Sequence, residues 1–133
     1  MKISSRFRYG LRLLVDLARS YEKGPVLLKN IAECERISKK YLEQIVISLR
    51  TAGILGATRG SKGGYYLTKS PDKIKLVDIY RLLEGPFSPV ECIDNPKGCV
   101  LVRTCPTRQL WDDLSKSIED TFKGITLSDL LKK

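Results

Sequence analysis

Three cysteines in one short segment are the residues of this chain best suited to metal or redox chemistry. Six residues separate Cys92 from Cys99 and five separate Cys99 from Cys105, in a stretch that also contains Pro96 and Gly98. Irregular backbone of this kind lets three thiolates converge, and soft thiolates favour iron–sulfur clusters or zinc. The alternative is three buried or idle thiols, but the segment offers little apolar periodicity to bury them. We therefore expect Cys92, Cys99 and Cys105 to be metal ligands.

A second group of residues is suited to binding a nucleic acid. It lies at the start of a predicted helix and consists of Ser38, Lys39, Lys40, Tyr41, Glu43 and Gln44. Lysines and hydroxyls at the positive end of a helix suit contact with phosphates. Gln44 can bind an adenine edge through two hydrogen bonds, whereas Glu43 accepts from cytosine or rejects the wrong base. These side chains predict a DNA-reading helix.

A glycine-rich run between two strand-like segments supplies further positive charge. Arg59, Gly60 and Lys62 lie in the run Arg59–Gly64, which is typical of a hairpin tip. Basic side chains on such a tip suit a narrow minor groove, where the negative potential is deepest. The alternative is that these are solvated charges on an ordinary turn. The order helix, turn, helix and basic hairpin favours the DNA interpretation.

The elements that must position these residues are predicted by periodicity and caps. We expect a helix from Ser4 or Ser5 to about Glu22, with an apolar face of Phe7, Leu11, Leu14, Leu17, Ala18 and Tyr21. Further helices are expected at about 29–35, 39–52, 76–84 and 107–123, strands at 54–58 and 65–68, and a closing turn at 127–131. No periodicity is apparent in residues 86–106. The predicted fold is mainly α with a small β-hairpin wing.

This order predicts a winged helix-turn-helix DNA-binding domain in residues 1–85, a cysteine-containing sensor loop in 86–106, and a dimerisation helix with a closing turn in 107–133. The last helix carries more apolar residues than a peripheral helix needs, namely Leu110, Trp111, Leu114, Ile118 and Phe122. A second copy of the chain is the economical place to bury them, so we expect a homodimer.

Composition sets limits on function. The chain has 133 residues with 24 Lys and Arg against 15 Asp and Glu, a net charge of +9. Residues 1–85 hold 17 basic and 8 acidic side chains, and residues 86–133 hold 7 of each, so the excess charge favours a polyanion partner for the first part. The absence of histidine excludes histidine-dependent catalysis and histidine-ligated zinc. We expect a cytoplasmic protein that is no enzyme and has no membrane partner, because neither a membrane-spanning run nor a Cys-x-x-Cys pair is present.

Short motifs along the chain resemble a known family. They are Arg8-Tyr9-Gly10-Leu11, Ile31-Ala32-Glu33, Tyr41-Leu42-Glu43-Gln44, Arg59-Gly60 with Gly63-Gly64-Tyr65, the three loop cysteines and Ile125-Thr126-Leu127. Over essentially its whole length the chain resembles the Rrf2 family of winged-helix transcription factors. The resemblance implies a dimer with crossing C-terminal helices on a pseudo-palindromic double-stranded operator. It also implies base reading at Lys40, Glu43 and Gln44, and a wing arginine at Arg59.

The resemblance further implies an iron–sulfur cluster on the three loop cysteines. A 2Fe–2S centre is expected, with a 4Fe–4S centre as the alternative. The protein is then expected to be a repressor that senses iron–sulfur status, redox state or nitric oxide, with the loop beside the dimer helix and the wing. A cluster-free regulator of the same fold, controlled by thiol oxidation, zinc or a partner protein, is the alternative function.

The fourth ligand departs from the family pattern. In the iron–sulfur regulator of the family a histidine stands three residues after the last cysteine, where this chain has Arg108, which stays protonated and cannot bind a metal. Other members use a carboxylate early in the first helix, where this chain has Arg8. The remaining candidates are Glu91, Asp94, Asp16 or an exogenous thiol or water. Cys34 is expected to be a packing or surface residue.

Overall fold

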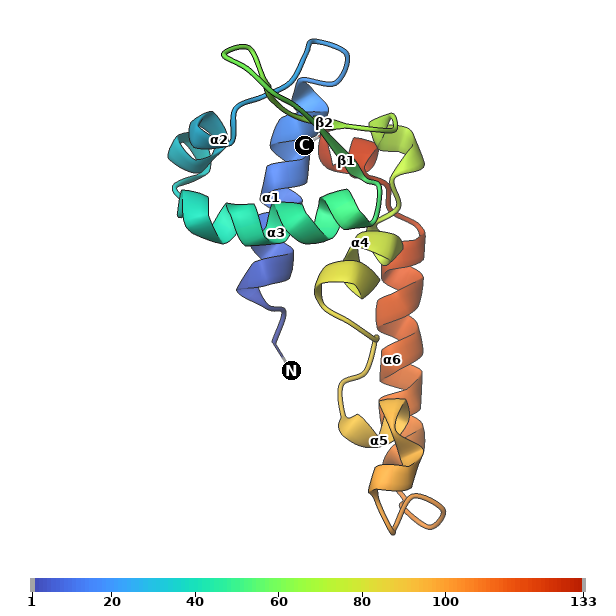
Figure 1. Cartoon of the computed structure of the whole chain (residues 1–133). Coiled ribbons are helices and arrows are strands. Elements are labelled where there is room, and N and C mark those ends of the chain that lie inside the picture. The colour runs from blue at the N-terminus through green and yellow to red at the C-terminus, as the bar shows by residue number, and fades with distance from the viewer. Residues whose placement is uncertain (1, 133) are drawn as a thin grey trace.

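The structure, a computed structural model, describes residues 2–132 and is mainly helical with one two-stranded antiparallel hairpin (Figure 1). The elements in chain order are α1 (Ser5–Arg19), α2 (Leu28–Glu35), α3 (Lys39–Thr51), β1 (Leu55–Thr58), β2 (Gly64–Leu67), the 3-10 helix η1 (Pro71–Lys73), α4 (Leu76–Leu83), α5 (Glu91–Asp94), the 3-10 helix η2 (Pro96–Gly98), α6 (Arg108–Lys123) and α7 (Leu127–Leu130). The predicted fold class is confirmed.

Helix α1 is the centre of the head formed by α1–α4, α7 and the hairpin, because α2, α3, α4, α7 and β2 all contact it. It therefore needs a wide apolar face: Leu13 is fully buried, whereas the predicted core residues Leu11 and Tyr21 are only half-buried. The helix also ends at Arg19 and not at about Glu22, since Glu22 adopts a left-handed φ of 66°. The prediction of this face was thus wrong in part.

The helix-turn-helix is formed by α2 and α3. Arg36 takes a left-handed φ of 56° after α2, which turns the chain, and the Ser38 side chain accepts a hydrogen bond from the Tyr41 backbone at 3.4 Å. The predicted cap of α3 is confirmed by this bond. The buried stripe of α3 consists, as expected, of Leu42, Ile45, Val46 and Leu49. The opposite face of α3 therefore points away from the head.

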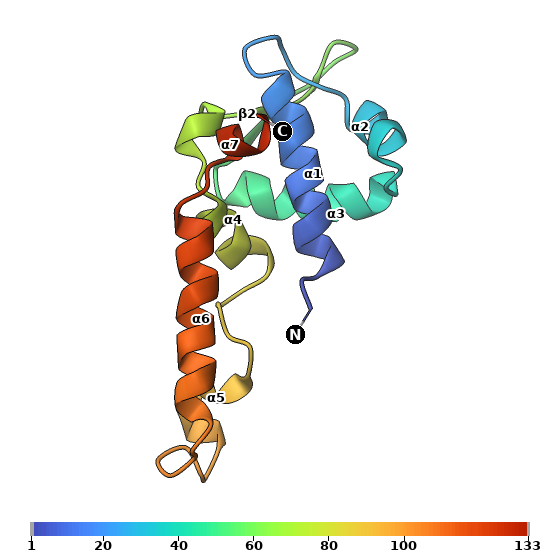
Figure 2. The ribbon, with the colours of Figure 1, turned by 180° about the vertical axis from the view of Figure 1, so that it is seen from behind.

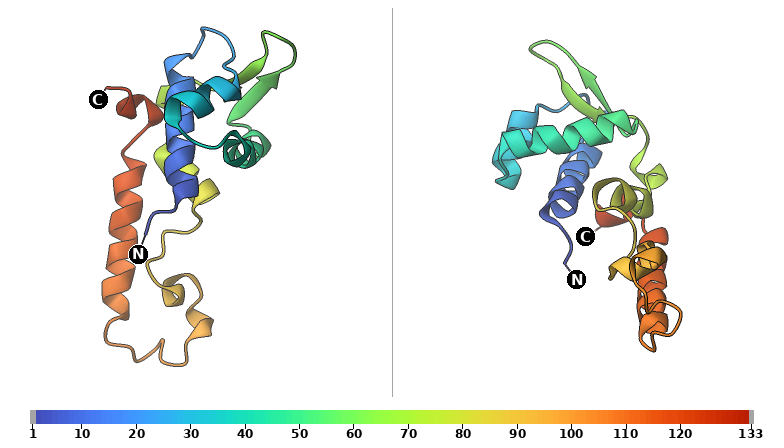
Figure 3. Two further views of the ribbon diagram at one scale, coloured as in Figure 1. Left: turned by 90° about the vertical axis from the view of Figure 1, so that its left-hand side faces the viewer. Right: turned by 60° about the horizontal axis from the view of Figure 1, so that its bottom comes forward.

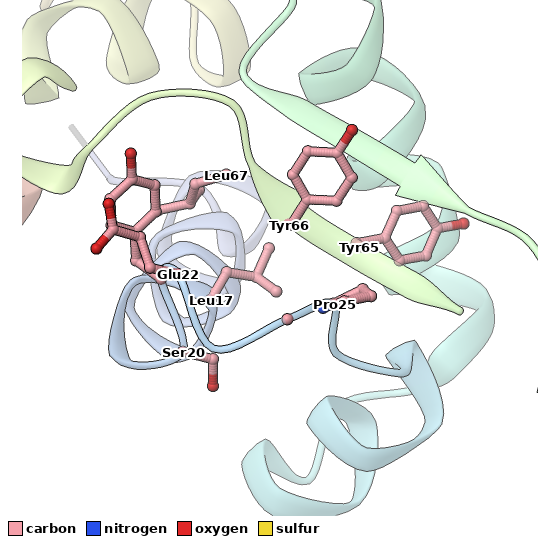
Figure 4. A pocket seen from close by; sticks show the side chains of 9 residues that line it. Leu17, Ser20, Glu22, Pro25, Tyr65, Tyr66 and Leu67 are labelled. Atoms are coloured by element: carbon pink, nitrogen blue, oxygen red, sulfur yellow. The ribbon is translucent and has the colours of Figure 1, made fainter. Parts of the chain in front are cut away.

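The hairpin is fixed to the segment that joins α1 to α2. Val26 and Tyr65 exchange backbone hydrogen bonds of 2.9 and 2.8 Å. Gly64 has a φ of +143°, and a Cβ at this position would collide with the Val26 carbonyl, so the approach requires glycine. A hollow of about 240 Å³ lies beside β2, where Leu17 and Pro25 flank the strand and Tyr65 and Tyr66 project from it (Figure 4). The wing is thus held close to its tip, next to the turn that follows Thr58.

Helix α6 extends away from the head, and residues 86–106 fold back along its far half (Figures 1 and 2). This segment contains two short helical turns, α5 and η2, which the lack of periodicity did not predict. At its other end α6 joins the core through Phe122, whose ring lies 5.7 Å from that of Phe7 and 4.9 Å from that of Tyr80. None of the helices within residues 2–132 has the length and apolarity required to cross a membrane.

Candidate nucleic-acid interface and cysteine loop

The outward face of α3 presents the polar side chains that the sequence singled out. Lys39, Lys40, Glu43 and Gln44 are all exposed on this helix. Lys39 Nζ lies 4.0 Å from Glu43 Oε1, so the one acidic group of this face is partly neutralised by its neighbour. These exposed side chains are open to a partner, and an α-helix fits the width of a major groove.

Two of the residues predicted to contact DNA also stabilise the fold. The Tyr41 ring is half-buried and packs edge-on against Tyr9 of α1, with 5.8 Å between ring centroids. Ser38 uses its hydroxyl oxygen to cap α3. At the hairpin tip, Arg59, Gly60 and Lys62 are exposed, and Gly60 has a φ of +106° with open space around it. The tip is therefore free to approach a partner.

A groove of about 430 Å³ joins α2, α3 and the hairpin, and its lining adds residues that the sequence interpretation missed. Its basic side chains are Lys29, Lys39, Arg50 and Arg59. Lys29 lies in the first turn of α2 and Arg50 in the last turn of α3, at positions where isolated basic residues gave no signal. Only the folded chain places them along one groove. Four cations around a single acidic side chain, Glu43, make this groove suited to a polyanion.

The three loop cysteines lie at the far end of α6. Cys92 belongs to α5, Cys99 follows η2, and Cys105 precedes α6; all three are free and half-buried. Their sulfur atoms do not come together as a group within 4.8 Å, whereas a tetrahedral zinc ion holds its sulfurs about 3.8 Å apart. Convergence on one centre therefore stays a prediction. The loop also lies away from the wing of its own protomer, contrary to expectation (Figures 1 and 3).

The surroundings of Cys105 favour an anionic sulfur. Its Sγ lies 3.2 Å from the Thr107 hydroxyl, and this hydrogen bond is the main cause that lowers the pKa of the thiol. A lowered pKa favours the thiolate, the form that binds metals. Arg108, at the expected fourth-ligand position, has a buried Nε without a hydrogen-bond partner among residues 2–132. The nitrogen cannot ligate a metal, but it is suited to donate to a nearby anionic sulfur.

The candidate fourth ligands are separated by the fold. Glu91 and Asp94 share α5 with Cys92. Asp16 instead lies in the head, where its ligand atoms fall within 4.8 Å of those of Cys34 and Glu35. Asp16 is thus remote from the cysteine loop of its own protomer. The pairing also gives exposed Cys34 two acidic neighbours, which the sequence did not predict.

The Asp16 carboxylate in the head is partly buried and lies beside a second carboxylate, that of Glu35. Burial raises its pKa above the ordinary value of 3.8, and the neighbouring Glu35 carboxylate raises it further, against the opposing effect of Arg19 and Arg12. Its Oδ2 atom is buried without a hydrogen-bond partner in the described part of the chain. Arg12 Nε meanwhile donates to Glu35 Oε1 at 2.9 Å. The α1–α2 contact therefore contains a carboxylate whose charged form is disfavoured relative to that of a free aspartate.

Comparison with known proteins places this architecture in one family. The family described as "Rrf2: Iron-dependent Transcriptional regulator" matches residues 3–133, and the chain belongs to it. It is therefore a member of a family of transcriptional regulators.

Particular relatives cover nearly the whole chain. The HTH-type transcriptional regulator CymR of Bacillus subtilis is 41% identical over 130 residues, which are 98% of this chain and 89% of CymR. The solved structure of CymR (YrzC), titled the global cysteine regulator of B. subtilis, superimposes with a TM-score of 0.83 at 39% identity, covering 99% of this chain and 97% of that one. The structure of T. potens IscR gives a TM-score of 0.82 at 39% identity, covering 99% and 87%.

The raised pKa of Asp16 predicts a pH-dependent cost to folding. The folded state binds the Asp16 proton more tightly than the unfolded state does, so protonation of Asp16 stabilises the fold. This contribution is complete below the ordinary pKa and is lost as the pH rises through the raised pKa. Asp16→Asn has a neutral side chain at every pH. Its free energy of unfolding should therefore rise relative to that of the wild type as the pH increases across this range. Urea denaturation over a pH series measures the difference. Asp120→Asn on exposed α6 is the control, and parallel curves for wild type and Asp16→Asn would contradict the assignment.

Proposed function

We propose that the chain represses transcription by binding a double-stranded operator through α3 and the hairpin wing, under the control of the cysteine loop. The observation that carries the proposal is the basic groove, in which Lys29, Lys39, Arg50 and Arg59 flank the exposed face of α3. Family membership supports regulation of transcription, and the groove supports DNA as the partner. Residues 1–85, which form the head together with α7, are the proposed DNA-binding domain.

The proposed contacts divide into phosphate, major-groove and minor-groove groups. Lys40, Glu43 and Gln44 on α3 would read base edges in the major groove, because they project from the face opposite the core. Arg59 and Lys62, with Gly60 between them, would enter the minor groove from the hairpin tip. Ser38, Lys39 and Tyr41 would contact phosphates at the start of α3, although the Ser38 oxygen also caps the helix and the Tyr41 ring also packs on Tyr9.

A second copy of the chain is the proposed partner of residues 107–133. The Leu110 side chain is 58% exposed on α6, and Leu114 lies on the same face one turn later. Ser115 is the one buried residue of this 16-residue helix. Two such faces packed together would bury the leucines and place two heads on a pseudo-palindromic operator. The dimer is the state that we propose binds DNA.

An iron–sulfur cluster, 2Fe–2S or 4Fe–4S, is the proposed cofactor of residues 86–106. Cys92, Cys99 and Cys105 would hold it, and three soft sulfurs suit iron better than hard cations. The surroundings of the cysteines also suit an anionic group. Arg108 Nε is a buried N–H donor that has no hydrogen-bond partner among residues 2–132. Such a cluster, when bound, supplies sensitivity to iron, redox state or nitric oxide. Glu91 and Asp94 on α5 are the nearest protein candidates for the fourth ligand.

A cluster-free regulator controlled by thiol oxidation is the second candidate. One observation favours it: a relative that covers nearly the whole chain is described as the global cysteine regulator of B. subtilis. In this case the free thiols themselves would be the responsive groups, and the lowered pKa of Cys105 would favour its reactive thiolate form. The two candidates share the head and differ only in the loop.

Removal of the wing arginine should weaken DNA binding. Arg59→Ala deletes a cation from the hairpin tip, and a single contact of this kind is worth about 1–3 kcal/mol, or roughly 5- to 150-fold in affinity. Fluorescence anisotropy with duplexes selected from a random-sequence pool measures the affinity at several salt concentrations. Lys116→Ala, which removes one positive charge from α6, is the matched control. Equal affinities for Arg59→Ala and wild type would disprove the role of the wing.

Substitution of the loop cysteines should abolish the visible absorption of protein purified without oxygen. Cys92→Ala and Cys105→Ala each remove one of three thiolates, so iron and acid-labile sulfide should fall with the absorption. Cys34→Ala, in the head, should leave all three measurements unchanged. Unchanged colour in the two loop variants would refute the ligand assignment. A wild-type protein that stays colourless after reconstitution with iron and sulfide would favour the thiol mechanism instead.

A lysine on the apolar face of α6 should separate the dimer into monomers. Leu110→Lys places a charge where the proposed interface must be dry, while the exposure of Leu110 leaves the fold of the protomer intact. Light scattering after gel filtration gives the mass, and circular dichroism checks the helix content. Gln109→Lys adds the same charge at the neighbouring exposed position, on a different face, and should remain a dimer. Dimers of unaltered stability in Leu110→Lys would place the interface elsewhere.

A further inference from the structure

Ile47 is an apolar residue in an unexpected place on α3. Its side chain is 65% exposed, while the four other aliphatic residues of the helix are almost completely buried. With 3.6 residues per turn, Ile47 projects from the centre of the face opposite that buried stripe. Its neighbours on the same line are Lys40, Gln44 and Thr51. An isolated exposed isoleucine is unremarkable on most surfaces, so its position among these neighbours carries the argument.

Cations border Ile47 on both sides of this face. On one flank Arg6 of α1 donates a hydrogen bond to the Ser48 hydroxyl at 2.5 Å, which brings its guanidinium beside the middle of α3. On the other flank Arg50 and Lys39 line the basic groove. A duplex bound with its phosphates against these two rows would place its groove floor opposite the centre of the helix. Ile47 would then face base edges and not phosphates.

The chemistry of the groove floor limits what an isoleucine can recognise there. The one apolar group that base pairs expose in the major groove is the C5-methyl of thymine. Thr51, a polar neighbour of Ile47 on this line, does not compete with it for a base. Its hydroxyl donates to the Ile47 carbonyl at 2.8 Å and is satisfied within the helix. Ile47 lies about 4.5 Å along the helix from Gln44, a distance of one or two base pairs.

We propose that Ile47 is a specificity-determining residue that reads a thymine methyl group, one or two base pairs from the base read by Gln44. The inference rests on the proposed function, since it requires α3 to lie in the major groove. It adds a requirement for thymine at a defined position in each half-site, where the polar residues of α3 alone require none. An isoleucine that covers the methyl would exclude water from both groups.

The test removes the methyl group from the DNA and the side chain from the protein. Duplexes are first selected from a random-sequence pool by the wild-type dimer, and each thymine is then replaced in turn by deoxyuridine, which lacks only the methyl. At one thymine per half-site, the replacement should weaken wild-type binding about fourfold, the value of one buried methylene-sized group. Ile47→Ala should bind the two duplexes equally. Ile47→Val, which keeps a branched apolar side chain, should retain a methyl effect.

The outcomes separate this inference from the function on which it rests. Ile47 is exposed, so Ile47→Ala should unfold at the temperature of the wild type and any change in binding reports the interface. If every thymine-to-deoxyuridine replacement affects wild type and Ile47→Ala to the same extent, the inference is overturned while DNA binding stands. If the wild-type dimer selects no duplex at all, the proposed function is overturned and the inference with it.

Discussion

The packing of α3 and α4 against α1 is the constraint on which the rest of the head depends. At Gly10 of α1 a Cβ would collide with the Leu83 side chain of α4, and it would lie at an ordinary contact distance of 3.5 Å from Ile45 of α3. Glycine inside a helix costs about 1 kcal/mol relative to alanine, and here it lets Leu83 pack against the backbone of α1. The position of α3 is set by its own buried stripe, which packs into the same core.

Fixing α3 in this way decides which of its residues meet a partner. Because Leu42, Ile45, Val46 and Leu49 are held against α1, the opposite face cannot turn inward and its side chains remain in water. The same packing brings the N-terminus of α2 and the tip end of the hairpin to one side of α3, where isolated cations line one groove. The electrostatic field of the head is thus a consequence of helix packing as much as of composition.

The parts of the fold that could be predicted from the sequence are those set by local rules. Ser38 predicted the start of α3, and the hairpin followed from the glycine-rich run. The groove could not be predicted, because Lys29 and Arg50 meet Arg59 only through tertiary packing. The burial of Leu13 in place of Leu11 was missed for a related reason: a helix surrounded on several sides has a wider apolar face than one stripe. In the loop, two short helical turns have too few residues for any periodicity to appear.

The distance between the cysteine loop and the wing determines how one could influence the other. The loop packs on the far half of α6, and the near end of α6 enters the core at Phe122, against Phe7 and Tyr80 (Figure 3). Phe7 lies on α1, the same helix against which α3 packs. A change in the loop would therefore reach α3 within one protomer as a displacement of α6 transmitted through these aromatic rings. In the proposed dimer a second route exists, because the angle between two α6 helices would set the separation of the two α3 helices, and affinity for a pseudo-palindrome depends on that separation directly.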